Sequence, residues 1–125
     1  MRTLNVLAFD EVVTGTGTTW YTPQALNSEL GRCDIFGLQA YTTGVLGTSP
    51  TLTVSLQHSG DDQNWRVLSS SLPELNATSI SSDTSRYAYR SDASPARFVR
   101  AAITLGGTNP QCRLKLFITG RSFGT

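Results

Sequence analysis

The single histidine, His58, limits the catalytic chemistry open to this sequence. Serine and cysteine nucleophiles are commonly activated by a neighbouring histidine base, so such a scheme would have to use His58. It ends a strand-like segment, precedes the turn-forming run 59–62, and belongs to no G-x-S-x-G elbow. The three glutamates are scattered, with no spacing that indicates a glycosidase carboxylate pair. We therefore expect no catalytic residues and predict that the protein is not an enzyme.

Metal and cofactor chemistry finds equally little support. One histidine and two distant cysteines, Cys33 and Cys112, do not make a zinc site, and we expect both thiols to be reduced. The run 61–64 (Asp-Asp-Gln-Asn) holds oxygen ligands of the kind calcium prefers, but it lacks the EF-hand spacing. Asp and Asn also stabilise tight turns by bonding their own backbone, which is our interpretation here. We predict no metal and no cofactor.

Composition describes a neutral chain rich in hydroxyl groups. Of 125 residues only 15% are charged, and ten basic against nine acidic residues leave a net charge of +1. Such a balance gives no electrostatic attraction to nucleic acid or to an anionic membrane, so we expect neither partner. No apolar run approaches the 18 residues of a membrane span, and no secretion signal is visible at the start. Nine arginines against one lysine suit protein interfaces, where arginine is enriched and lysine depleted.

Strand signals dominate the chain. Apolar and polar residues alternate with period two in 51–58, 112–118, 35–43 and 98–105, which is typical of half-buried strands. The alternation predicts a set of inward residues: Leu52, Val54, Leu56, Cys112, Leu114, Leu116, Ile118, Phe36, Leu38, Ala40, Val99, Ala101, Ile103 and Leu105. Weaker strand signals cover 4–9, 12–21, 65–72 and 86–90, while 23–30 suggests a loop with one turn.

About eight short strands separated by turn signals predict an all-β fold, a single-domain antiparallel β-sandwich or jelly roll spanning 1–125. We expect residues 1–10 to form an extended N-terminal arm or the first strand. Two similar runs, Gly-Thr-Ser-Pro at 47–50 and Gly-Thr-Asn-Pro at 107–110, each lie between two strand signals. They predict two similar β-hairpins that are neighbours in the fold.

Outward aromatic residues favour contact with other proteins. Phe117 falls on the outer face of its strand beside Lys115, and Trp20 and Tyr21 come just before a proline. Our candidate interface residues are Phe117, Lys115, Trp20, Tyr21, Leu4 and Val6.

Four segments of the sequence share a layout that is found in a known class of proteins. Residues 50–65 contain an alternating strand that ends in Ser-Gly-Asp-Asp with a tryptophan shortly after it, and 13–18, 97–105 and 116–121 fit the same layout. The chain resembles small β-sandwich structural proteins of tailed-phage virions, of the capsid-decorating or minor capsid type. The resemblance implies a virion protein, made in the host cytoplasm, whose partners are other virion proteins, the major capsid protein above all. We also expect a homo-oligomer, with a trimer favoured at a threefold capsid site.

Two alternatives remain open. The strand, turn and tryptophan layout also occurs in discoidin-like carbohydrate-binding modules, in which Trp65 would be a sugar platform and Asp61, Asp62 and Asn64 its polar partners. A self-assembling capsid or tail subunit fits the same composition.

Overall fold

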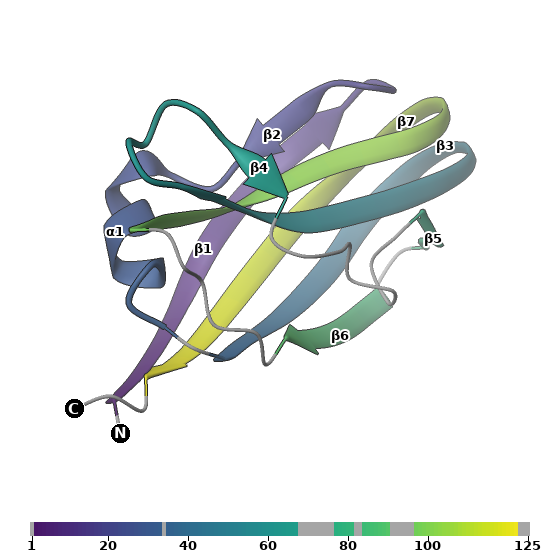
Figure 1. Ribbon diagram of the computed structural model, residues 1–125. Coiled ribbons are helices and arrows are strands. Elements are labelled where there is room, and N and C mark those ends of the chain that lie inside the picture. Colours follow the sequence, from purple (N-terminus) through teal and green to yellow (C-terminus); the bar gives the residue numbers. More distant parts are fainter. Residues whose placement is uncertain (1, 34, 68–76, 82–83, 91–96, 123–125) are drawn as a thin grey trace.

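The computed structural model describes residues 2–33, 35–67, 77–81, 84–90 and 97–122, which are mostly β-strand (Figure 1). In chain order the elements are β1 (Arg2–Thr14), β2 (Thr19–Tyr21), the 3-10 turn η1 (Gln24–Leu26), α1 (Asn27–Leu30), β3 (Ile35–Ser59), β4 (Arg66–Val67), β5 (Thr78–Ser79), β6 (Thr84–Arg90) and β7 (Phe98–Ser122). The all-β prediction is therefore confirmed. None of the helices in these ranges is long and apolar enough to cross a membrane.

Two 25-residue strands, β3 and β7, form the centre of the fold. They pair antiparallel along their whole length, from Ile35 opposite Arg121 to Ser59 opposite Phe98. Both strands turn back at the same end of the molecule, near residues 47–50 and 107–110 (Figure 1). The paired ribbon is thus folded over on itself and divides one hydrogen-bonded sheet into two layers.

Among the described residues the first layer contains four strand segments and the second contains five. The first layer runs β1, β7 (111–122), β3 (35–46) and β6. The second layer runs β2, β7 (98–106), β3 (51–59) and β4, with β5 also paired to β3. A double sheet made by folding a long antiparallel ribbon over on itself is a jelly roll, the more specific of the two forms that we predicted.

The two Gly-Thr-x-Pro turns are neighbours, as predicted, because each lies against the backbone of the other. The hairpin part of that prediction was wrong in one respect. The two arms of each turn pair with the other long strand in the described register, not with one another. The arms belong to opposite layers, which separate to enclose the core, so their hydrogen bonds run sideways within each layer.

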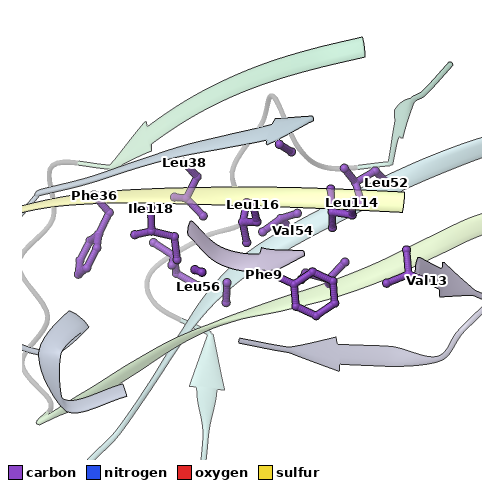
Figure 2. Close-up of a cluster of buried hydrophobic side chains, with 14 of the residues drawn as sticks. Phe9, Val13, Phe36, Leu38, Leu52, Val54, Leu56, Leu114, Leu116 and Ile118 are labelled. Carbon is purple, nitrogen blue, oxygen red and sulfur yellow. The ribbon is translucent and has the colours of Figure 1, made fainter. Parts of the chain in front are cut away.

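Side chains from the inner faces of both layers form the core (Figure 2). All fourteen residues predicted to face inward are buried, and eleven of them, including Phe36, Leu52 and Leu116, are fully enclosed at 0% exposure. Leu30 of α1 and Phe9 and Val13 of β1 add to this cluster. The alternation of apolar and polar residues identified the core correctly because each layer has one face that is buried against the other layer.

The weaker signals were less accurate at element boundaries. The predicted strand 12–21 is divided between β1 and β2, since Gly15 and Gly17 adopt positive φ angles of 87° and 82° and form a loop. The turn predicted in 23–30 corresponds to η1 and α1. The predicted strand 65–72 contains β4, and its residues 68–72 lie outside the described ranges. Residues 2–10 belong to β1, so the N-terminal segment is a strand of the sheet.

Candidate functional site

His58 lies near the end of β3, half-buried, with Val99 of β7 opposite it on one side and Arg66 of β4 on the other. Its Nδ1 atom is buried without a hydrogen-bond partner among the described residues. The described ranges also contain no cluster of three or more His, Cys, Asp or Glu residues that could hold a metal ion.

Asp61 organises the turn that follows β3. Its Oδ1 accepts hydrogen bonds from the Ser59 hydroxyl (2.7 Å) and from the backbone N–H groups of Gln63 (3.0 Å) and Asn64 (2.8 Å). Its Oδ2 accepts a fourth from the Asn64 side-chain amide at 2.6 Å. The backbone N–H groups of Asn64 and Gln63, followed by the Ser59 hydroxyl, hold the pKa of the Asp61 carboxyl well below its usual range. Asp61 therefore stabilises a tight turn, as we predicted for this acidic run.

Asp62 ties the same turn to the segment before β3. One carboxylate oxygen accepts from Nε2 of Gln24 and the other from Nδ2 of Asn27, both at 2.8 Å. Asp62 adopts a φ of 60°, a left-handed conformation that aspartate tolerates better than most residues. Both acidic residues proposed as polar partners for a sugar are therefore engaged in holding this loop in place.

The candidate site is a three-layer stack on the outer face of the second layer. The guanidinium of Arg100 lies 3.8 Å from the ring centre of Tyr21 and 4.1 Å from that of Trp65. Its Nε donates to Oε1 of Gln57, the residue opposite it in the sheet, at 2.8 Å. Partial burial lowers the pKa of Arg100, an effect opposed by the negative charge of Asp62. Cation–π contacts contribute from about 0.5 kcal/mol at exposed sites to about 2 kcal/mol when desolvated, so the two contacts hold the guanidinium firmly.

Each partner in the stack comes from a different element. Arg100 points outward because its neighbours in β7, Val99 and Ala101, face the core. Tyr21 is paired with Ala102 in the β2–β7 ladder, two residues further along the same outer face. Trp65 is placed beside them by the turn and by β4, whose Arg66 pairs with His58. Tyr21 and Trp65 were predicted from the sequence as candidate contact residues and Arg100 was not, although strand alternation alone put Arg100 on the outer face.

A groove of about 630 Å³ runs beside the stack, on the side of the turn. Trp65 forms part of its wall together with His58, Asn64 and Arg66. The groove contains hydroxyl and amide groups as well as the indole, because Ser59 and Gln63 also line it. Sugars are commonly bound by such a combination of aromatic and hydrogen-bonding side chains.

A second candidate surface is the outer face of the first layer. Leu7 of β1 and Phe117 of β7 lie directly opposite each other in the ladder, and their side chains are 50% and 37% exposed. Val12, also 50% exposed, lies further along β1 on the same face. Lys115, which is half-buried, lies opposite Asp10 between these apolar side chains.

Asp10 also forms a 2.9 Å ion pair with Nε of Arg113. The hydrogen bond to Arg113 lowers the pKa of Asp10, and the same bond raises the pKa of Arg113. The pair is solvent-accessible, so its contribution to stability is small.

The remaining interface candidates lie closer to the core than Leu7 and Phe117 do. Leu4, Val6 and Trp20 are only partly exposed and pack against the core cluster. A register shift between Leu7 and Phe9 places Ala8 in a β-bulge, after which the inward positions of β1 change parity. Leu7 is therefore the exposed apolar residue of this segment. Contact with a partner stays a prediction for all of these residues.

No family model matches the chain, and no curated protein matches it. Solved structures do share its fold. VP2 of infectious bursal disease virus, in a subviral particle, aligns with a TM-score of 0.55 at 10% identity, over 94% of this chain and 32% of that one. This chain therefore spans about a third of the length of VP2. A chain of the cyanophage Pam1 capsid asymmetric unit aligns with a TM-score of 0.50 at 13% identity, over 97% and 85% of the two chains.

A xylanase that contains a carbohydrate-binding module also shares the fold. A chain from Clostridium thermocellum xylanase Xyn10B, with its family 22 carbohydrate-binding and catalytic modules in complex with xylohexaose, aligns with a TM-score of 0.51. The identity is 13%, over 98% of this chain and 26% of that one. At these identities the likeness concerns the fold alone. The chain is a jelly roll whose architecture is found in viral capsid proteins and in carbohydrate-binding modules.

Proposed function

We propose that this chain is a non-enzymatic structural protein of a phage-like particle, one that decorates or stabilises the capsid through protein–protein contacts. The observation that carries the proposal is the exposed Leu7–Phe117 pair on the first layer's outer face, where the edge strand β1 pairs with β7. Large apolar side chains placed together on a sheet surface gain free energy when a partner removes them from water. Other capsid proteins, including copies of this chain, are the proposed partners, and the virion is the proposed location.

Light scattering after size-exclusion chromatography, at several protein concentrations, tests the self-association that this function implies. We expect a discrete closed oligomer, with a trimer favoured. Replacing both Leu7→Ser and Phe117→Ser should reduce the measured mass to that of a monomer. The matched control is Val67→Ser, which removes an equally exposed apolar side chain (50%) from β4 in the second layer and should leave the oligomer intact. A wild-type monomer at every concentration would contradict the proposed oligomer.

A second candidate function is saccharide binding, favoured by the groove in which Trp65 lies beside amide and hydroxyl groups. Xylohexaose is a suitable neutral probe. If the groove binds it, the indole fluorescence should shift on addition, and a folded Trp65→Ala variant should lose the shift. A Trp20→Phe variant is the control, because Trp20 packs against the core and should not report binding.

A further inference from the structure

Arg100 is held in place before any partner arrives. The ring centres of Tyr21 and Trp65 lie 3.8 and 4.1 Å from its guanidinium, and Gln57 accepts the hydrogen bond from its Nε. An arginine side chain that is free in solution loses substantial rotamer entropy when it binds. Folding already restricts the rotamers of Arg100, so less entropy remains to be lost on binding. A preorganised group of this kind binds its partner more tightly.

The remaining hydrogen-bond donors of Arg100 are available. A guanidinium has five N–H groups in one plane, and only the Nε–H is used within the described part of the chain. The two Nη groups present a planar fork that matches the two oxygens of a carboxylate. Neutral acceptors cannot use this fork as fully, since they lack the charge and the second oxygen.

No carboxylate in the described ranges forms an ion pair with Arg100, so the charge of Arg100 is offset only in part. Asp62 is the carboxylate that acts on Arg100, but its oxygens already accept hydrogen bonds from Gln24 and Asn27. Asp61 of the same turn is saturated by four hydrogen bonds. Two further arginines, Arg66 of β4 and Arg97 just before β7, have exposed side chains.

We propose that the outer face of the second layer is a protein-binding surface, on which Arg100 receives an aspartate or glutamate side chain of a partner protein. A protein partner fits better than a saccharide, because Arg100 is not among the residues that line the groove. The surrounding sheet face carries short hydroxyl side chains, such as Ser55 and Thr104, which leave the stack accessible to another surface. Clustered Tyr, Trp and Arg are typical of the residues that contribute most to protein interfaces. The Leu7–Phe117 pair belongs to the other layer, and the two surfaces adjoin at the edge, where Leu7 and Tyr21 line one pocket. Variants at Arg100 and at Phe117 test the two proposals separately.

NMR spectroscopy of the arginine side-chain N–H groups in the full chain tests the proposal. The probes are a blocked pentapeptide with one glutamate between glycines and serines, the same peptide with glutamine, and glucuronate. We expect the Arg100 Nε and Nη signals to shift on titration with the glutamate peptide. Saturation by the glutamine peptide should need at least a tenfold higher concentration.

Two variants and a control complete the test. Arg100→Gln should abolish the response, and Arg100→Lys, which keeps the charge but loses the fork, should weaken it several-fold. Arg97→Gln, which removes an exposed charge outside the stack, should bind as the wild type does. The proposal is overturned by the absence of any wild-type shift, by equal binding of the glutamine peptide, or by unchanged binding in Arg100→Lys. Glucuronate binding tenfold more tightly than the glutamate peptide would also overturn it, and would assign the site to acidic saccharides.

Discussion

Gly47 and Gly107, sixty residues apart in the sequence, pack reciprocally where the β3–β7 ribbon folds over. A Cβ on Gly47 would lie 2.7 Å from the carbonyl oxygen of Asn109, and a Cβ on Gly107 would lie 2.7 Å from that of Ser49. Both glycines have strongly positive φ angles, 108° and 104°. The two turns can therefore nest against each other only if both positions lack a side chain.

The Gly107→Ala substitution should destabilise the protein markedly. It adds a left-handed strain of about 1–3 kcal/mol and a clash with backbone atoms, which cannot move as a flexible side chain could. We expect the midpoint of urea unfolding to fall accordingly, without loss of the β-type circular dichroism spectrum at zero denaturant.

Two other glycines serve as controls for that experiment. Gly44 has a φ of 59° but open space around it, and Gly60 has open space and no positive φ. Gly44→Ala should show the backbone strain alone, whereas Gly60→Ala should be close to neutral. A Gly107→Ala variant as stable as Gly60→Ala would contradict the nested arrangement of the turns.

Leu116 and Phe117 are adjacent in β7 but lie on opposite faces of the first layer. Leu116 is fully buried, whereas Phe117 is 37% exposed. Leu116→Ala should lower the free energy of unfolding by about 2–5 kcal/mol, the range for buried leucines that leave a cavity. Phe117→Ala should cost much less, and its main effect should be on association. Equal losses of stability in urea titrations would argue against this assignment of faces.

Asp61 should have a carboxyl pKa below the value of about 3.9 that is usual for an unfolded chain. Because the pKa is lowered on folding, the Asp61 carboxylate stabilises the fold above that unfolded value. This stabilisation is lost as the pH falls through the lower pKa of the folded state. A ¹³C titration of the Asp61 carboxyl group measures the shift directly, and Asn64→Ala, which removes one of its donors, should raise the pKa part of the way back. A titration midpoint at or above 3.9 would contradict the observed network.

Cys112 should be unreactive in the native protein. Burial raises the pKa of its thiol to about 11, so at pH 8 the reactive thiolate is scarce as well as inaccessible. Because the thiol pKa is higher in the folded protein, the neutral Cys112 thiol stabilises the fold at pH values below the thiol pKa of the unfolded chain. This stabilisation is lost as the pH rises through the thiol pKa of the folded protein. A thiol-specific chromophoric reagent should titrate Cys112 only after denaturation. A Cys33→Ser variant isolates its signal, and rapid labelling of that variant at pH 8 without denaturant would show that the site is open.

The sequence by itself determined the class of fold and the core. Alternation with period two in four segments identified the fourteen inward residues, because a strand in a two-layer sheet has one dry and one wet face. The repeated Gly-Thr-x-Pro run indicated that two turns are equivalent and adjacent. Glycine and proline restrict the backbone locally, so this information is present in the chain without any knowledge of the contacts.

Only the tertiary structure decided which outward residues meet. Tyr21, Trp65 and Arg100 come from three distant segments, and the β2–β7 and β3–β4 registers bring them together. Similarly, the bulge at Ala8 changed which side chains of β1 face solvent and left Leu7 opposite Phe117. Register depends on the pairing energy of whole strands, and a shift of one residue moves every side chain to the other face. That is why the outer surfaces, unlike the core, could not be assembled from local patterns.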